Sequence, residues 1–170
     1  MFLNVWKRKS IKRNLESLLD DLSSIEPTTD IKLVGILVEY PAFKDFEKLR
    51  KMTTNLGPRV NCKILCYVSK LRNAKDLHED KFDSSGFTWK GKVTDGDIIE
   101  FTDKPFDLLI SYYKTDNLFL HYVTALAKTG FRVGFPLEES RLNNLSIIVD
   151  MDNVDAFEVE LKKYLKILTV

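Results

Sequence analysis

The chain has 170 residues, of which 44% are hydrophobic and 30% are charged, and this length suits one domain that buries its own core without disulfides or metal. A formal net charge of +1 excludes an overall field that would draw the whole molecule to nucleic acid, an acidic substrate or an anionic membrane, so any such attraction must be local. Seven glycines and five prolines leave no low-complexity segment, and disorder is not expected outside the ends.

The first expected element is an amphipathic helix over residues 4–23. Ile11, Leu15, Leu18 and Leu22 recur at alternating spacings of four and three, which places them on one stripe. The first half of the helix is basic and the second half acidic, which opposes the helix macrodipole. We therefore expect this helix to gain its order by docking on its own sheet, on a second copy, on RNA or on a membrane surface.

The start of this helix supplies the candidate partner-binding residues. Phe2, Leu3 and Val5 offer apolar contact, and a basic cluster follows them, whereas a secretory signal places its positive charge first. A solvated basic face on a self-docked helix is the simpler alternative, because cations without interleaved aromatics are a weak nucleic-acid signal. No run of 18 apolar residues occurs, so we expect no transmembrane segment and a cytoplasmic protein. The partner-binding candidates are Trp6, Lys7, Arg8, Lys9, Lys12 and Arg13.

Two continuous apolar runs follow a linker at residues 26–30. Residues 31–40 and 60–68 are too uniformly apolar for strands with one wet face, so they predict strands covered on both sides. Pro41 is expected as the first residue of a helix that ends near Gly57. The two cysteines lie four apart on the second strand, a spacing that places free thiols on one face, as expected in a reducing compartment.

The segment 69–105 is the least regular, and its turn signals predict two short strands, near 87–93 and 97–101, with a hairpin as one arrangement. A strand at 106–112 follows. Thr115 is expected to cap a helix over 116–128. Two further strands and a final helix complete the chain; they are expected at 131–135, 145–149 and 153–168.

Strands that alternate with helices predict an α/β fold. We expect a mainly parallel, five-stranded, doubly wound sheet of the flavodoxin-like or Rossmann-like kind, in the order 2-1-3-4-5, preceded by an N-terminal amphipathic helix. No helix separates the last two strands, so one of them is expected to be antiparallel or at an edge. We assign 1–26 to the N-terminal helix and 27–170 to a single α/β domain with an irregular insertion at about 69–105.

Ligands of open α/β sheets bind outside the carboxyl ends of the strands, where the strand order reverses. In this sheet that crevice lies between the ends of the strands at 31–40 and 106–112, where a small polar ligand is one prediction. The alternative is that the tyrosines pack with their hydroxyls in water and the charges are solvated. The ligand-binding candidates are Glu39, Tyr40, Ser69, Ser111, Tyr112, Tyr113 and Lys114.

The carboxyl-end loops lack the usual nucleotide-binding chemistry. Phosphate loops need glycines so that backbone N–H groups can approach the anion, yet the first turn reads VEYPAF, without glycine and with a proline that removes a donor. The chain has neither a G-x-G-x-x-G pattern nor a Walker lysine motif. A dinucleotide-binding or P-loop enzyme is therefore not expected, and no cofactor is predicted.

A second motif is the acidic pair in IIVDMDNV, residues 147–154. This pattern resembles the first motif of haloacid dehalogenase phosphatases, in which the first aspartate is the nucleophile and the pair helps to hold magnesium. In that family the remaining catalytic residues follow the motif, whereas only 16 residues follow Val154. Asp152 or Asn153 is therefore expected to cap the last helix.

The histidines do not indicate catalysis. His78 lies in a charged loop, and His121 falls on a helix face with Thr124 and Lys128, so both are expected to face solvent. Neither has a Cys or His at metal-ligand spacing, and no Ser-His-Asp or Cys-His arrangement is supported. We predict no metal site, and these observations weigh against an enzyme.

Several segments carry a resemblance to a known family: FDLLISYY, ALAKTGFRVGF and FEVELKKYLKIL, together with WKGKV and the basic start. In these segments the chain resembles an uncharacterised family of small bacterial proteins of the Bacteroidota. That family has no established activity or binding residues. The resemblance therefore implies a cytoplasmic bacterial setting and transfers no functional position.

Three functional hypotheses remain. The leading one is a non-enzymatic α/β interaction or adaptor module whose N-terminal helix mediates self-association or binds a partner protein, and it expects deletion of residues 1–24 to leave the domain folded. The alternative is an enzyme or sensor that binds a small polar ligand at the strand-end crevice. The third is association with RNA or the ribosome through the basic helix.

Overall fold

The computed structural model describes residues 2–22 and 25–169. Within these residues the chain forms one six-stranded sheet in the order β3-β2-β1-β4-β5-β6, and every pair of neighbouring strands is parallel. In chain order the strands are β1 (Leu33–Glu39), β2 (Asn61–Tyr67), β3 (Asp80–Phe82), β4 (Leu108–Tyr112), β5 (Arg132–Gly134) and β6 (Leu145–Ser146).

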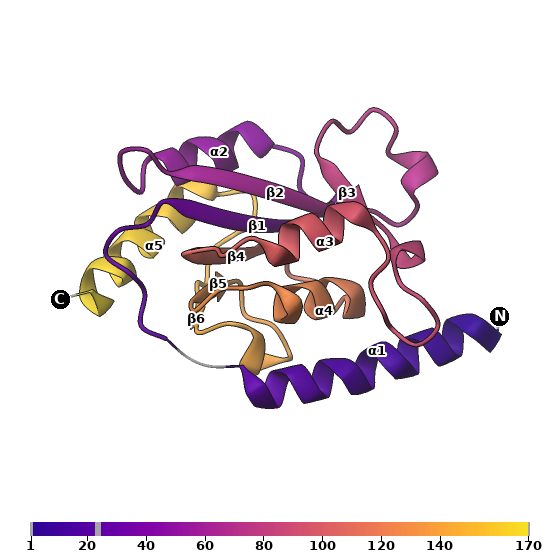
Figure 1. Cartoon of the computed structure of the whole chain (residues 1–170). Helices are drawn as coiled ribbons and strands as arrows, with labels where there is room; N and C mark the ends of the chain where they lie inside the picture. The colour runs from indigo at the N-terminus through magenta and orange to yellow at the C-terminus, as the bar shows by residue number, and fades with distance from the viewer. Residues whose placement is uncertain (1, 23–24, 170) are drawn as a thin grey trace.

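Helices of the described chain cover both faces of this sheet, α1, α3 and α4 on one face and α2 and α5 on the other (Figure 1). This enclosure explains why the central strands are apolar on both sides. The helices are α1 (Phe2–Asp21), α2 (Phe46–Thr54), α3 (Gly96–Asp103), α4 (Leu118–Leu126) and α5 (Val154–Leu168).

Side chains along each central strand alternate between the two faces of the sheet. Val34, Ile36 and Val38 of β1 pack in the core beneath α2 and α5. Leu37 points the other way, into the core beneath α1, α3 and α4. All four are fully buried, and each contributes roughly 1.5–3 kcal/mol relative to an exposed position. The sheet thus joins two separate apolar cores.

The prediction of an α/β fold with a parallel sheet is confirmed, with six strands in place of five. The five predicted strands occur in the predicted order, and β3, within the irregular segment, extends the sheet beside β2. The last strand, β6, lies at the other edge and is parallel to β5. The expectation that one of the last two strands is at an edge is therefore confirmed.

The strand predicted near 97–101 is wrong, because these residues belong to α3. Asp95 caps this helix: its Oδ1 accepts hydrogen bonds from the backbone N–H groups of Asp97 and Ile98 at 2.9 and 3.2 Å. Ile98 and Phe101, three residues apart, are buried on one side of it. The aliphatic residues of the predicted strand at 97–101 thus belong to a short helix, and the Asp95 cap sets where this helix begins.

Two other predicted helix starts need correction. The helix after β1 begins at Phe46 rather than at Pro41, because Asp45 caps it by accepting from the N–H of Lys48. The helix after β4 is capped by Asn117 rather than by Thr115. The prediction for the last helix is confirmed, since Asn153 Oδ1 accepts from the N–H of Ala156 at 3.0 Å.

The N-terminal helix is docked on its own domain along most of its length. Ile11 and Leu15 are buried, as their periodicity predicts, and Leu19 is the third buried apolar side chain. Leu18 and Leu22 are only partly buried at the margin of the same core, and Ser23 lies outside the described residues. These side chains pack over α4, so α1 forms part of the domain core (Figure 1).

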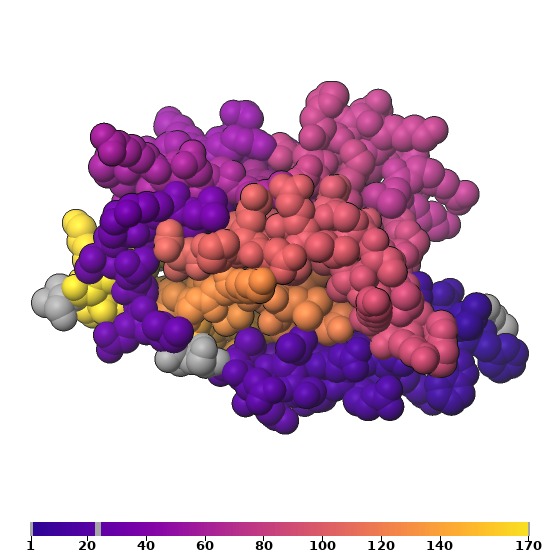
Figure 2. Space-filling view, in the orientation of Figure 1, coloured from indigo at the N-terminus to yellow at the C-terminus, as the bar shows by residue number. Residues whose placement is uncertain are grey.

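The loop between β3 and α3 is fitted closely against α1, as the space-filling view shows (Figure 2). Its central residue, Gly91, has φ of +80°, and a Cβ there would lie 2.8 Å from Asn14 Nδ2 and 3.2 Å from Ile11 Cγ1. Both the conformation and the close approach therefore require glycine. In the same loop, the strand predicted at 87–93 is reduced to an antiparallel bridge between its first and last residues.

Because α1 contributes to the core, we expect Leu15→Ala to lower the free energy of unfolding by about 2–5 kcal/mol, through lost apolar burial and the cavity that remains. Arg13→Ala, on the exposed side of the same helix, should change it by less than about 0.5 kcal/mol. Urea denaturation followed by circular dichroism measures both. For the same reason we now expect deletion of residues 1–24 to destabilise the domain. Equal, small effects of both substitutions would contradict a docked helix.

Candidate functional site

The order of the strands reverses between β1 and β4, because β2 and β3 continue on one side of this pair and β5 and β6 on the other. In open parallel sheets, this is the point at which loops diverge and leave a crevice at the carboxyl ends of the strands. Here β1 ends at Glu39 and β4 leads into the loop at residues 113–117. The candidate site is therefore sought around these two strand ends.

Tyr112 is a core residue. Its ring centroid lies 4.9 Å from those of Phe43 and Phe135 and 5.1 Å from that of Phe157. Its hydroxyl donates a hydrogen bond of 2.7 Å to the carbonyl of Met151. Burial raises the pKa of this hydroxyl above its ordinary value. Tyr112 thus secures the α5 side of the sheet and does not line an open crevice.

Tyr113 and Ser111 are also enclosed, on the opposite face of the sheet. Tyr113 is 1% exposed, and its hydroxyl shares a 2.8 Å hydrogen bond with Thr124 Oγ1 of α4. Burial raises its pKa as well. Ser111 is fully buried. The aromatic corner of the predicted crevice is therefore filled by its own side chains.

The remaining candidates at this corner are dispersed. Lys114 Nζ donates to the carbonyl of Val149 at 2.9 Å and lies 4.8 Å from the ring centroid of Phe135, on the α5 side. Tyr40 is half-buried, and Ser69 is exposed on the loop after β2. Among the predicted ligand-binding residues, Glu39 lines a hollow at the strand ends.

Two adjoining hollows lie between α1 and the carboxyl ends of β1, β4 and β5, and they share Arg8, Asp116 and Leu118. We call them together the switch-point groove. The hollow nearer β1 has a volume of about 290 Å³ and is lined by Arg8, Glu39, Tyr67, Thr115, Asp116, Asn117, Leu118 and Phe119. The hollow nearer β5 has a volume of about 350 Å³ and is lined by Arg8, Lys12, Leu15, Glu16, Asp116, Leu118, His121, Glu138 and Glu139.

Glu39 fixes the loop that separates β4 from α4. Its two carboxylate oxygens accept hydrogen bonds from Thr115 Oγ1 and, at 3.4 Å, from Asn117 Nδ2. Asn117 in turn caps α4 with its Oδ1, which accepts from the N–H groups of Phe119 and Leu120. The end of β1 therefore positions the start of α4, and Thr115 serves this contact instead of capping.

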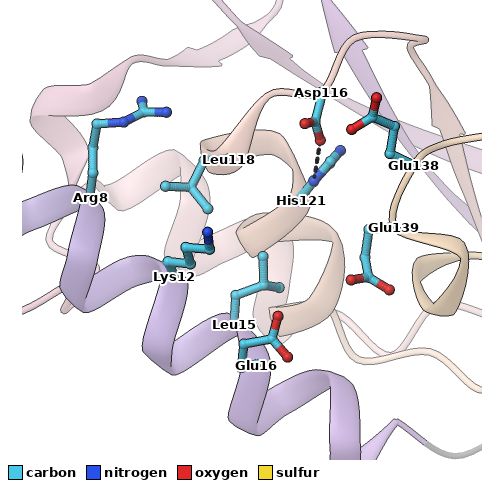
Figure 3. Close-up of a pocket in the computed structure, with 9 residues that line it drawn as sticks. All are labelled: Arg8, Lys12, Leu15, Glu16, Asp116, Leu118, His121, Glu138 and Glu139. Atoms are coloured by element: carbon cyan, nitrogen blue, oxygen red, sulfur yellow. Dashed lines mark ion pairs between the residues drawn. The ribbon is translucent and has the colours of Figure 1, made fainter.

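His121 lies in the hollow nearer β5, and the prediction that it faces solvent is wrong. It is 3% exposed, its Nδ1 lies 3.5 Å from Asp116 Oδ1, and its Nε2 is buried without a hydrogen-bond partner in the described structure. Figure 3 shows the ring directed between Asp116 and Glu138. His78, by contrast, is exposed as predicted.

The burial of His121 follows from the composition of α4. Its sequence, LFLHYVTAL, is apolar at nearly every position, and residues 119–125 are all buried. A helix that is apolar all round is covered on all sides. The uniform apolarity of this segment, rather than its periodicity, indicates that His121 and Thr124 are buried.

The electrostatic state of His121 is set by burial and by neighbouring carboxylates. Burial lowers the pKa of the imidazole below 6.5, and the charge of Asp116, the backbone of Thr115 and the charge of Glu139 oppose this shift without cancelling it. The ring is therefore neutral near pH 7. The negative charge of Asp116, whose Oδ1 lies 3.5 Å from Nδ1, favours the tautomer with the proton on Nδ1, and this leaves the lone pair on Nε2.

Charge is divided across the hollow nearer β5 (Figure 3). Arg8 and Lys12 enter from α1, whereas Asp116 and Glu138 approach from the loops after β4 and β5. Glu139 pairs with Arg141 at 2.8 Å, which lowers the pKa of its carboxyl. In the described part of the chain, no group of three or more His, Cys, Asp or Glu side chains could hold a metal ion.

The basic residues predicted to meet a partner divide between two sides of α1. Lys7 Nζ donates to the carbonyl of Ser84 at 3.0 Å. Arg8 stacks 5.8 Å from the ring centroid of Phe119, and Lys12 lines the groove. The other predicted partner-binding residues, Trp6, Lys9 and Arg13, are exposed.

These features define a parallel α/β protein with an open groove at the strand ends and with no helix, in the residues described, long and apolar enough to cross a membrane. The chain belongs to a family of unknown function, DUF6913, whose model matches residues 7–168. This agrees with the prediction of an uncharacterised family. No curated protein and no solved structure matches the chain.

The buried imidazole predicts how stability depends on pH. The folded state disfavours a proton on His121. The contribution of the neutral ring to the free energy of unfolding is therefore complete above about pH 6.5. It is lost as the pH falls below the unfolded-state pKa, by up to about 1.4 kcal/mol per pH unit. Urea denaturation between pH 7.5 and 5.5 should show this slope in the wild type. His121→Gln should flatten it, and His78→Gln should not. A slope unchanged by His121→Gln would refute the assignment.

Proposed function

We propose that this chain is a non-enzymatic interaction module that binds a partner protein through the N-terminal end of α1. The observation that carries the proposal is the exposure of the first apolar residues: Phe2, Leu3, Val5 and Trp6 are 82%, 66%, 52% and 56% exposed. This end of the helix extends beyond the carboxyl ends of the strands (Figure 1). Four large apolar side chains in solvent at one helix end are typical of a surface that becomes buried on association.

The exposed side of α1 has a defined pattern. Phe2, Trp6, Lys9 and Arg13 follow one another at spacings of four, three and four residues, opposite the docked side that includes Ile11. We call these four residues the outer stripe; it is apolar in its first half and basic in its second half. Lys9 Nζ lies 5.5 Å from the ring centroid of Trp6, a contact that helps to hold both side chains in one arrangement.

This pattern favours a protein groove over a membrane. Helices that bind in grooves use anchors at i, i+4 and i+7 on a narrow stripe, and Trp and Arg are frequent hot spots of such interfaces. In a helix that lies in a membrane surface, the apolar residues share one face and the cations take the other. Here Lys9 and Arg13 share the face of Phe2 and Trp6, so a helix lying flat would bury the cations. The partner surface is expected to combine an apolar pocket with an acidic end.

RNA is a weaker candidate for the same surface. Lys7 and Arg8 contact Ser84 and Phe119 of their own domain. Lys9 and Arg13 are therefore the two cations of the outer stripe. Proteins that bind the phosphate backbone generally use more than two cationic contacts, so RNA fits this surface less well.

We also infer the finer identity of the fold and its setting. The order β3-β2-β1-β4-β5-β6 supports a doubly wound, Rossmann-like arrangement. A cytoplasmic location in a bacterium of the Bacteroidota is inferred from the resemblance of the sequence alone. Fractionation of the source cells tests the location.

The partner is accessible to site-specific photo-crosslinking in the source organism. A benzophenone side chain at position 6 should yield an adduct with one protein, and the cross-linked peptide should contain acidic residues. With that protein purified, Trp6→Ala should weaken binding at least tenfold, consistent with an interface hot spot of about 2 kcal/mol. Lys9→Glu together with Arg13→Glu should weaken it comparably.

A photo-crosslinker at Val159, which is 63% exposed on α5, is the matched control and should give no such adduct. Adducts formed equally from positions 6 and 159 would reject the surface. Cross-linking only to a second copy, flotation with phosphatidylglycerol vesicles, or salt-sensitive retention on RNA would each replace the proposed partner with another.

A further inference from the structure

We propose that the switch-point groove binds a small zwitterion of the free amino acid class, with its ammonium group beside His121, Asp116 and Glu138 and its carboxylate toward Arg8 and Lys12. This site is separate from the outer stripe of α1, because Arg8 and Lys12 line the groove whereas Phe2 and Trp6 do not. The inference therefore does not depend on the proposed partner protein.

The first observation is the unsatisfied imidazole. The side chain of His121 is only 3% exposed, and it lines the hollow nearer β5. Its Nε2 has no hydrogen-bond partner in the described structure. Buried polar atoms are nearly always hydrogen-bonded, and leaving one unpaired costs free energy. An unpaired atom of this kind at the wall of a groove is best explained by a ligand that binds in the groove and pairs with it.

The protonation of the imidazole determines which chemical group of the ligand can pair with Nε2. Asp116 Oδ1 lies 3.5 Å from Nδ1 and favours the proton on that nitrogen, so Nε2 presents a lone pair and accepts a hydrogen bond. The ligand must therefore supply an N–H or O–H donor. Glu138 makes no ion pair among the described residues and lies on the same side of the groove as Asp116 and His121 in Figure 3. Two carboxylates around one acceptor favour an ammonium group as the donor.

A metal ion is a poorer fit for this acidic end. No three His, Cys, Asp or Glu side chains of the described chain come together as a metal site. Glu139, the remaining carboxylate of this wall, is already paired with Arg141 at 2.8 Å. An ammonium group needs no such closed coordination shell, since it can donate to His121, Asp116 and Glu138 from different directions.

The opposite wall determines the rest of the ligand. Arg8 and Lys12 lie one helical turn apart on α1, so their cationic groups enter the groove from the same side. Leu15 and Leu118 line the groove with them and offer apolar contact. Figure 3 shows the two cations on α1 and Asp116 and Glu138 across from them. Glu16, the carboxylate that α1 itself contributes to the lining, is paired with Arg141 at 3.0 Å. A carboxylate at one end and an ammonium group at the other match this division of charge.

The size of the groove limits the ligand to a small molecule. The hollow nearer β5 measures about 350 Å³, near the lower end of the roughly 300–1,000 Å³ typical of ligand pockets. The adjoining hollow at Glu39 adds about 290 Å³, which leaves space for a polar side chain. The class is therefore a free amino acid, and a longer polar side chain would extend toward Glu39.

The test uses the full chain and calorimetric titration with each of the twenty free amino acids. At least one should bind, and two matched analogues should bind at least tenfold more weakly: the amine that lacks the carboxylate and the hydroxy acid that lacks the ammonium group. Glu138→Gln and Lys12→Gln should each raise the Kd at least tenfold. Both residues are exposed, so the variants should fold. Lys166→Gln, on the exposed part of α5, should leave the Kd unchanged.

Three outcomes overturn the proposal. The first is the absence of heat and of any thermal shift with all twenty amino acids at 10 mM, a probe concentration of about ten times a 1 mM Kd. The second is equal binding of the amine alone, which would make the groove a cation site. The third is binding that survives both Glu138→Gln and Lys12→Gln. An NMR resonance of His121 Nε2 that shifts on titration of the wild type supports the assignment directly.

Discussion

The packing of α1 over α4 is the contact on which the other features of this molecule depend. The sheet covers one side of α4, and Ile11, Leu15 and Leu19 of α1 pack in the same core from the other. Asn14 Nδ2 adds a bond of 3.4 Å to the hydroxyl of Tyr122. The enclosure of α4 is what buries His121, and the position of α1 is what forms the outer wall of the groove. Without α1 there would be an exposed apolar helix and no groove.

Docking also accounts for a helix whose charges are unfavourable for its own stability. Basic residues lie in the first half of α1 and acidic residues in the second, against the macrodipole. The domain uses these charges: Lys7 donates to the carbonyl of Ser84, and Arg141 pairs with Glu16 and Asp20 at 3.0 and 3.3 Å. Surface pairs of this kind contribute little individually, so the apolar contacts hold the helix and the charges fix its orientation.

Five strands, β1, β2, β4, β5 and β6, could be predicted from the sequence, whereas β3 and most of the site could not, and particular residues explain the difference. Continuous apolar runs identify strands covered on both faces because only such strands can lack polar positions. Tyr112 and Tyr113 resemble surface tyrosines in sequence, since nothing local shows that Met151 and Thr124, distant in the chain, accept or share their hydrogen bonds. The periodicity of α4 predicts an exposed His121, but the uniform apolarity of this helix is the stronger signal and agrees with the buried position. Glu39 was placed at the strand end correctly because the end of a buried strand is visible in sequence.

The two proposed sites use different sides of one helix, and this has a thermodynamic consequence. Coupling between two ligands requires a structural element whose two states each ligand binds differently. The inner side of α1 is held by its apolar core, by Asn14 and by the pairs with Arg141, so a ligand in the groove finds the helix already in place. A partner on Phe2 and Trp6 meets residues that lie beyond the docked part of the helix. The structure therefore favours independent binding at the two sites, and any coupling would have to arise from Arg8, at the junction between the groove and the outer end of the helix.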